Sequence, residues 1–223
     1  MINITKDTLR EAIRNIPKTV DAAYHRILCI SCLLRIERTI RWFRIYIHFD
    51  RKGDYPFPQW QLMLASYHGL EGICQRMLER GAKVEKKDEL GRTPLWWAAY
   101  AGKEATVQLL LKNGADIEAK NNNGLTALHM AAQFGREAAV GLLLEYSCPI
   151  DEKDDYGNTA LHWTAGSHRV SSRMATMTIL LEGGADVNAV DGFGRTVLER
   201  LETMKDREDC ISLCRKYQAK CQD

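Results

Sequence analysis

The sequence predicts an all-α protein whose helices stack as a solenoid of about five helix-turn-helix repeats. The first observation is a repeated stretch: residues Gly91 to Asn123 return in similar form 33 residues later, at Gly124, and again at Gly157. Self-similarity at such a period is typical of solenoids. The second observation is an apolar triple near the end of each unit, at 109–111, 142–144 and 179–181. Its face is too wide for a lone helix pair, so neighbouring repeats must cover it.

The repeats are expected at 58–90, 91–123, 124–156, 157–193 and 194–223, and together they form one domain of residues 58–223. In the second, third and fourth units a threonine precedes the first helix and can cap it. The first unit has a degraded opening. The last unit is charged and keeps few apolar residues in its second helix, which is typical of a terminal repeat with a polar outer face.

Two units depart from this pattern. The third closes with Ser-Cys-Pro at 147–149, whereas Gly114 and Gly184 can end the second helices of their units in the left-handed conformation. We therefore expect a strained or differently closed helix end at Ser147. The fourth unit is 37 residues long, and its four extra residues, within 166–174, are expected to lengthen the loop between its helices. This Ser- and Arg-rich stretch is interpreted as a tolerated surface insertion, with phosphorylation or partner contact as alternatives.

The opening tetrapeptides of three units resemble those of the ankyrin repeat. They are Thr-Pro-Leu-Trp at 93–96 and Thr-Ala-Leu-His at 126–129 and 159–162, and paired alanines and Gly-Ala-Asp closings accompany them. The resemblance covers residues 58–223 and implies a binding module without chemistry. It also implies that His129 and His162 hydrogen-bond to neighbouring backbone. Trp96 replaces this histidine in the second unit and is therefore interpreted as a packing residue.

Residues 1–57 are expected to form a basic, amphipathic helical segment. Residues 1–58 contain eleven Lys and Arg against six Asp and Glu, a net charge of +5. Because the whole chain has a net charge of +2, the remaining residues carry a net charge of −3. The sequences at 16–21 and 24–28 resemble the helical region after the NACHT module of fungal NLR-like (STAND) receptors, which often end in ankyrin arrays. Residues 27–49 are strongly apolar, but their arginines exclude a membrane span. A helix lying on an anionic membrane and a helix packed on the first repeat both remain open.

Seven cysteines at irregular spacing predict reduced, mostly buried thiols in a cytoplasmic protein, with a nuclear location as the alternative. Cys29 and Cys32 are interpreted as neighbours on one helix face, because no second pair has matching spacing. The sequence contains no Gly-rich phosphate loop, no His-Glu-x-x-His and no Gly-x-Ser-x-Gly. We therefore expect no enzyme activity, no cofactor and no metal site.

The predicted array is net acidic, whereas nucleic-acid binding needs a concentrated basic face. We therefore expect a protein partner, no nucleic acid and a monomeric chain. By resemblance, partners meet the loops between repeats and the exposed side of the first helices, where large aromatic and Met side chains are candidate hot spots. Binding and packing both remain open for Trp97 and Trp163. The predicted protein-binding residues are Trp97, Tyr100, Met130, Gln133, Phe134 and Trp163 on the helices, and Glu89, Arg92, Asn122, Asn123, Asp155, Tyr156, Phe193 and Arg195 on the loops.

The preferred hypothesis is a non-catalytic protein-interaction scaffold. The first alternative is the C-terminal sensor fragment of a fungal NLR-like signalling receptor. The second is a peripheral membrane adaptor that attaches through residues 27–49.

Overall fold

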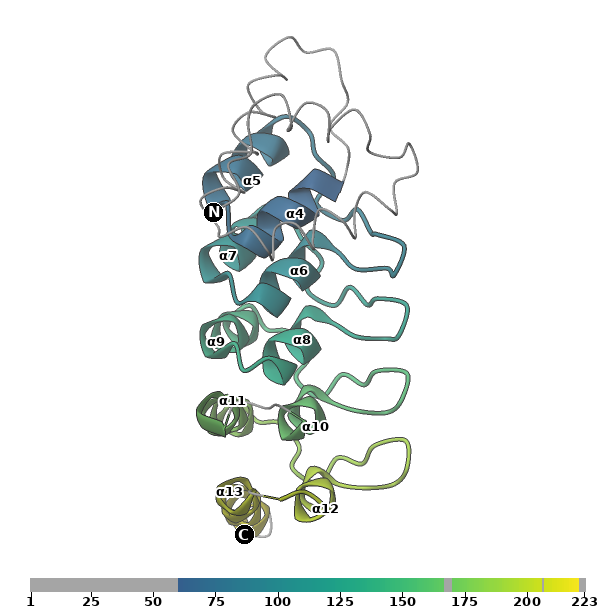
Figure 1. Cartoon of the computed structure of the whole chain (residues 1–223), viewed down its shortest axis with the longest axis vertical. Coiled ribbons are helices and arrows are strands. Elements are labelled where there is room, and N and C mark those ends of the chain that lie inside the picture. The colour runs from purple at the N-terminus through teal and green to yellow at the C-terminus, as the bar shows by residue number, and fades with distance from the viewer. Residues whose placement is uncertain (1–59, 167–169, 206, 221–223) are drawn as a thin grey trace, which may run out of the picture. The chain divides into compact units, whose positions relative to one another are not determined.

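The computed structural model describes residues 60–166, 170–205 and 207–220 (Figure 1). The predictions for the N-terminal segment lie outside these residues. They are its helices, the boundary before residue 58, the amphipathic stretch at 27–49 and the NACHT-associated resemblance.

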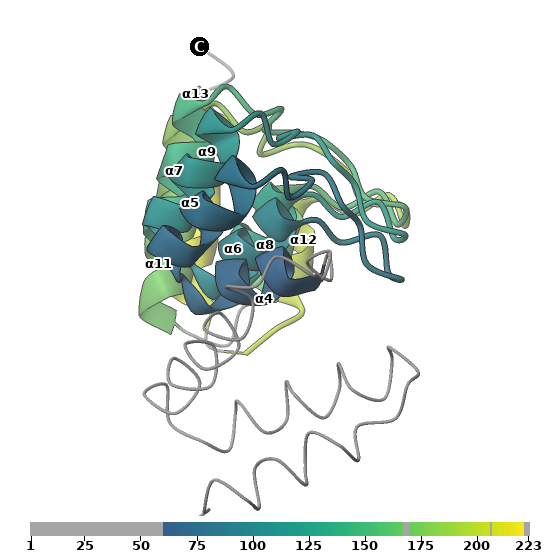
Figure 2. The same cartoon turned by 90° about the horizontal axis from the view of Figure 1, so that it is seen from above.

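The described residues form ten helices in five pairs and no strand, apart from a single bridge between Val190 and Thr196. First helices pack on first helices and second helices on second helices, which gives two layers (Figure 1). Seen from above the stack, the loops between repeats project to one side (Figure 2). The predicted all-α repeat solenoid is confirmed. The pairs are α4 (Trp60–His68) with α5 (Glu71–Glu79), α6 (Pro94–Ala101) with α7 (Glu104–Lys112), α8 (Ala127–Gln133) with α9 (Glu137–Glu145), α10 (Ala160–Ala165) with α11 (Val170–Glu182), and α12 (Val197–Glu202) with α13 (Glu208–Lys220).

Threonine begins the first helix of each pair after the first. Thr93 adopts an extended conformation and its hydroxyl accepts a hydrogen bond from the N–H of Trp96 at 3.2 Å. Such a cap satisfies one of the backbone N–H groups that a helix start leaves without a partner. The remaining N-caps of this kind are Thr126, Thr159 and Thr196.

The core lies between the two helix layers. One leucine of each apolar triple, namely Leu110, Leu143 or Leu180, has no solvent exposure. The flanking members of the triples are less completely covered, except Leu142 and Leu181, which are also buried. Small residues at the paired-alanine positions, such as Ala98 and Ala131, are also fully buried and let adjacent first helices approach closely.

The residues that end the second helices have the backbone conformations that the sequence predicts. Gly114 and Gly184 have φ values of +81° and +93°, as predicted. Ser147, in the same place in the third repeat, has a φ of +58° and is the one non-glycine residue with positive φ among those described. A left-handed residue with a side chain is strained by about 1–2 kcal/mol. The expected strain at this helix end is therefore confirmed.

The four extra residues of the fourth repeat do not simply lengthen the loop, and that prediction needs correction. Helix α11 has 13 residues, whereas α7 and α9 have nine. The turns before α7 and α9 contain Gly102 and Gly135 in the left-handed conformation. The extra stretch from Val170 has no glycine, so its residues continue the helix in the N-terminal direction.

The extension of α11 contains a buried arginine. Arg173 is the repeat equivalent of Lys103 and Arg136. Each of the three lies eleven residues before the left-handed residue at the end of its second helix, which is Gly184, Gly114 or Ser147. Arg136 donates from Nε to the carbonyl of Tyr100 at 3.0 Å. Arg173 instead has no solvent exposure, and none of its guanidinium nitrogens has a hydrogen-bond partner in the described structure. A buried cation without a partner destabilises a fold.

Four of the cysteines, Cys74, Cys148, Cys210 and Cys214, are described, and all are buried free thiols. Burial raises the pKa of Cys74 to about 11 and those of Cys148 and Cys214 to about 12. Buried thiols of this kind are chemically inert.

Candidate protein-binding surface

The four loops between repeats, which we call fingers, share one turn. They comprise residues 85–92, 118–125, 151–158 and 188–195. In each finger, the fourth residue is Asp or Asn, and its side chain accepts hydrogen bonds from backbone N–H groups two and four residues later. In the third finger, Asp154 Oδ1 accepts from Tyr156 at 2.9 Å and from Asn158 at 2.7 Å. A glycine with positive φ follows the finger tip in every case, so the sequence Asp/Asn-x-x-Gly specifies the turn.

Neighbouring fingers are joined through their backbones. The N–H of Gly192 donates to the carbonyl of Tyr156 at 2.8 Å, and the equivalent bonds join Asn122 to Leu90 and Asp155 to Asn123. Addition of a Cβ at Gly157 would bring it within 2.5 Å of the Gly192 nitrogen, so the close approach requires glycine there. The fingers therefore form one connected edge.

A row of lysines adds a second connection between fingers. Lys87 donates from Nζ to the carbonyl of Lys120 at 3.0 Å, and Lys120 donates to the carbonyl of Lys153 at 3.2 Å. Lys153 in turn donates to the carbonyl of Val190 at 2.8 Å. The sequence analysis does not predict this row, although its lysines recur at the 33-residue period.

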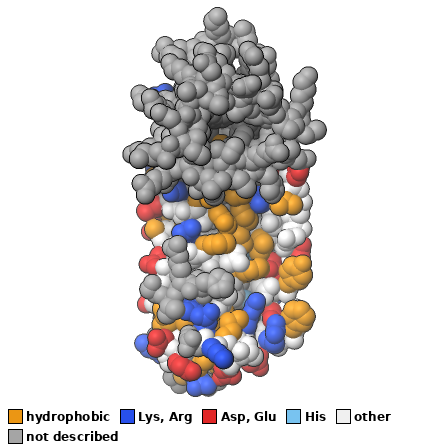
Figure 3. Space-filling model, in the orientation of Figure 1, with side chains coloured by type: hydrophobic (Ala, Val, Ile, Leu, Met, Phe, Trp, Pro, Cys, Tyr) orange, Lys and Arg blue, Asp and Glu red, His pale blue; other side chains and the backbone are white. Residues whose placement is uncertain are grey.

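The four finger tips are the residues immediately before these glycines. They are Leu90, Asn123, Tyr156 and Phe193, and all four are exposed. Of the five exposed large hydrophobic residues in the described structure, three are tips and a fourth, Val190, also lies on a finger. Figure 3 shows hydrophobic side chains on the finger side and, separately, over the first helices. Three of the tips are among the predicted protein-binding residues, and Leu90 is not.

Two tryptophans hold the base of their fingers. The indole Nε1 of Trp163 donates to Asp154 Oδ2 at 3.0 Å, and that of Trp97 donates to Asp88 Oδ2 at 3.3 Å. Both aspartates are the turn residues of their fingers. At the second finger the equivalent positions are Asn121 and Met130, so neither the carboxylate nor the indole is present.

The expectation that Trp97 and Met130 occupy exposed sites is wrong. They are 6% and 3% exposed. The guanidinium of Arg92 lies 4.2 Å from the centre of the Trp97 ring, and its Nε also donates to Asp88 at 2.7 Å. Trp97 is therefore held between its finger and the neighbouring helices. Trp163 remains half-buried.

Aromatic side chains gather on one side of the first helices α4, α6 and α8. We call this side, which carries Tyr67, Tyr100, Gln133 and Phe134, the inner face. The ring of Tyr100 stacks on Trp96 with centroids 5.6 Å apart and meets Phe134 at 4.5 Å. Tyr67 from α4 joins the same cluster, 6.0 Å from Tyr100. Trp96 is 6% exposed, so its predicted packing role is confirmed.

The remaining predicted residues lie on one side of the described array. Tyr100, Gln133 and Phe134 are half-buried near the ends of first helices, and Arg92 is half-buried at the base of the first finger. The other members lie exposed on the fingers: Glu89, Asn122, Asn123, Asp155, Tyr156, Phe193 and Arg195. The structure thus places the helical and finger residues along two neighbouring strips of one face.

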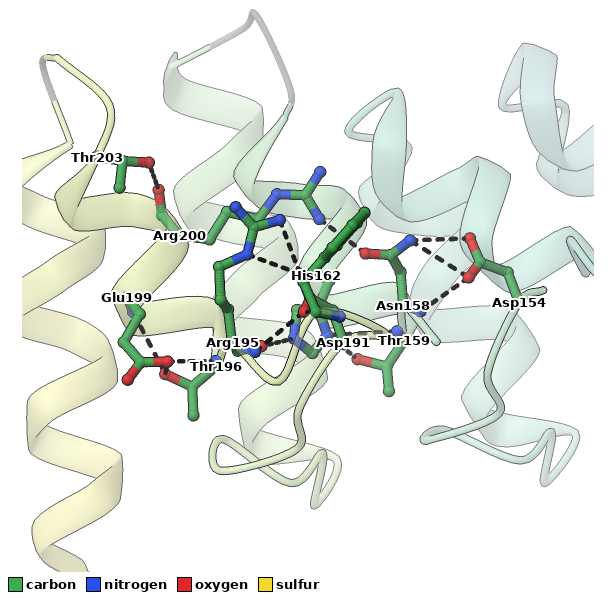
Figure 4. A network of polar contacts seen from close by, with 11 residues as sticks. Asp154, Asn158, Thr159, His162, Asp191, Arg195, Thr196, Glu199, Arg200 and Thr203 are labelled. Atoms are coloured by element: carbon green, nitrogen blue, oxygen red, sulfur yellow. Dashed lines mark hydrogen bonds and ion pairs between the residues drawn. The ribbon is translucent and has the colours of Figure 1, made fainter. Parts of the chain in front are cut away.

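The two histidines occupy the structural position that the resemblance implied. In His129, Nδ1 accepts from the N–H of Thr126 at 3.1 Å, and Nε2 donates to the carbonyl of Glu152 at 3.0 Å. His162 likewise bonds to Thr159 and to the carbonyl of Arg195 (Figure 4). This pattern requires the neutral ring with the proton on Nε2. Burial lowers the pKa of both histidines, which favours the same form.

The last two repeats share a further polar network (Figure 4). Arg200 from α12 donates to Asn158 Oδ1 at 2.8 Å, and the Asn158 amide donates to Asp154 at 3.2 Å. Asp191 accepts from the guanidinium of Arg195 at 3.1 Å. The first two contacts join the third finger to α12, and the third closes the fourth finger on itself.

Within the described ranges, no helix is long and apolar enough to cross a membrane. The same residues contain no group of three or more His, Cys, Asp or Glu side chains that could hold a metal ion.

A family model described as ankyrin repeats (three copies) matches residues 62–154 and residues 107–191. Together the matches span 62–191, more than half of the 223-residue chain. The chain therefore belongs to the ankyrin-repeat family. No curated protein matches the chain.

Proposed function

We propose that the chain is a non-catalytic protein-interaction module that binds a protein partner across its fingers and the inner face of its first helices. The observation that carries this proposal is that four of the five exposed large hydrophobic residues in the described structure lie on the fingers. Tyr156 and Phe193 are 62% and 77% exposed on the fingers, and the half-buried rings of Tyr100 and Phe134 lie on the adjoining helices. Aromatic residues of this kind dominate the energetics of protein interfaces.

The rigidity of the surface also supports recognition without chemistry. Each finger is closed by its own Asp or Asn and joined to the next by backbone bonds, so little backbone must be ordered on binding. The chain acts as a monomer in this proposal. Its buried free thiols are consistent with a reducing location such as the cytoplasm.

Site-specific photocrosslinking tests the proposal. A benzophenone amino acid is placed at Gln133 on the inner face, at Tyr156 on a finger, or at Gln108, which is exposed on second helix α7. We expect protein adducts in cells from the first two positions and none from Gln108. Adducts from Gln108 alone, or equal adducts from all three, would overturn the assignment of the binding face.

The receptor and membrane alternatives depend on residues 16–28 and 27–49, outside the described residues. The transcript upstream of Met1 tests the first, because a receptor would encode a phosphate-loop module there. Absence of that module contradicts the receptor hypothesis. The membrane alternative is tested by vesicle flotation, described below.

A further inference from the structure

The finger tips form a regular row of contact points. Each finger runs out and back as two adjacent segments, and successive fingers are joined by backbone hydrogen bonds. The first helices of neighbouring repeats also pack on one another, and packed helices lie about 8–10 Å apart. Equivalent tips are therefore expected about 10 Å apart, so Tyr156 and Phe193 are one such step from each other and Leu90 is two steps from Tyr156.

This spacing matches one face of an α-helix. With a rise of about 1.5 Å per residue, residues seven positions apart lie on the same side of a helix about 10.5 Å apart. An extended strand repeats its face about every 6.7 Å and does not match. A polyproline helix repeats at about 9.3 Å, but such ligands dock in grooves lined by aromatic rings. Among the described aromatic contacts, neither Tyr156 nor Phe193 has another ring beside it.

The charge of the third finger selects a basic ligand. Residues 151–158 contain four acidic side chains and one lysine, a balance of −3. In each of the other three fingers, acidic and basic side chains are equal in number, so the net charge is zero. Residues 85–92 contain three of each kind, and residues 118–125 and 188–195 contain one of each.

Lys153 donates to the carbonyl of Val190, and Glu152 forms an ion pair with Lys120 of the second finger. Asp154 is buried, so Asp151 and Asp155 are the carboxylates of the third finger that face a ligand. The second and third fingers together still balance to −3. Opposite charge across an interface favours encounter and excludes acidic partners.

We propose that the third and fourth fingers bind a basic amphipathic α-helix of a partner protein. Apolar residues seven positions apart on that helix contact Tyr156 and Phe193, and its Lys or Arg side chains lie over residues 151–158. The proposal rests on the protein-binding function proposed above and names the partner's chemistry and the residues that select it.

A displayed library of helical peptides of about three heptads provides the probe. Peptides are selected on the full chain, and enriched clones are measured against Tyr156→Ser, Phe193→Ser and Asp155→Lys. The first two replace highly exposed side chains, and Asp155 is exposed with no hydrogen bond to its carboxylate in the described structure, so all three variants are expected to fold. Gln108→Ser on α7 is the matched control, and circular dichroism verifies the fold of each variant.

We expect enriched clones to have a net positive charge and apolar residues seven positions apart. Their affinity is expected to fall about tenfold or more for each finger-tip variant. It also falls for Asp155→Lys and with added salt, and Gln108→Ser has no effect.

Three outcomes would overturn the inference: no enriched clone, clones that are acidic or proline-rich, or binding unchanged by the tip variants. Clones that instead lose binding on Tyr100→Ser would overturn this inference and leave the proposed function intact. Crosslinking confined to the second helices would overturn both.

Discussion

The hydrogen bond between Trp163 and Asp154 offers a quantitative test of how the fingers are held. Trp163→Phe keeps an aromatic ring at this half-buried position, although a smaller one, and removes the indole N–H. That N–H lies 3.0 Å from Oδ2 of Asp154, a residue that is 5% exposed. A buried carboxylate that loses a donor cannot recover it fully from water.

The expected magnitude follows from the other donors at the carboxylate. A hydrogen bond to a charged group contributes about 1.5–3 kcal/mol. Asp154 Oδ2 keeps a bond from the Asn158 amide at 3.2 Å, so we expect a loss near the lower end, about 1.5–2 kcal/mol.

Trp97→Phe is the matched control. The Trp97 bond to Asp88 is longer, at 3.3 Å, and Arg92 Nε still donates to the same oxygen at 2.7 Å. Because Trp97 is buried against neighbouring rings, its smaller replacement also loses packing, so the comparison uses the coupling energy with Asp88→Asn. We expect that coupling to be less than about 1 kcal/mol.

The assay is urea unfolding of the full chain followed by circular dichroism, with Asp154→Asn completing a double-mutant cycle with Trp163→Phe. The coupling energy is expected to be about 1–2 kcal/mol. The hydrogen-bond interpretation is wrong if the Trp163–Asp154 cycle shows no coupling, or if the Trp97–Asp88 coupling is equally large.

Four further predictions follow from the described residues and the sequence. Burial holds the pKa of His129 and His162 below the ordinary value, so the unfolded chain binds more protons below about pH 6.5 and the free energy of unfolding falls between pH 7 and 5. Changing both to Gln weakens this dependence in urea titrations, and an unchanged slope contradicts it. Ser147→Gly relieves the positive φ and stabilises the chain by about 0.5–1 kcal/mol in the same assay, whereas a loss of stability would disprove strain there. Arg173→Met removes the buried unpaired cation and raises the unfolding free energy by about 1–4 kcal/mol, and any decrease would show that the charge is satisfied. If residues 1–58 attach to membranes, they float with anionic vesicles and stop floating when the four arginines within 27–49 become Gln; absence of flotation for the unmodified segment ends the membrane hypothesis.

The repeat architecture was predictable because its determinants are local in sequence. A threonine cap, a histidine three residues later and a glycine at the helix end recur at a fixed period, and each acts within a few residues. The left-handed conformations at Gly114 and Gly184 and the strain at Ser147 followed from the same reasoning.

The details of the site were harder to predict because they depend on which neighbour covers each position. Trp97, Met130 and Trp163 are equivalent in sequence, yet the first two are buried and the third is half-buried. The long α11 could not be foreseen from a repeat template, because the template places a glycine turn where this chain has none. The lysine row was readable from the 33-residue spacing, but its carbonyl acceptors were not, since those bonds cross between fingers.

Amide hydrogen–deuterium exchange tests whether the chain has a single preformed binding face. The full chain is compared alone and in complex with a partner identified by crosslinking or with an enriched helical clone. We expect new protection from amide exchange in the fingers and first helices, strongest at 151–158 and 188–195. No change is expected in second helices α7 and α9. Protection centred on α7 and α9, with the fingers unchanged, would contradict this expectation.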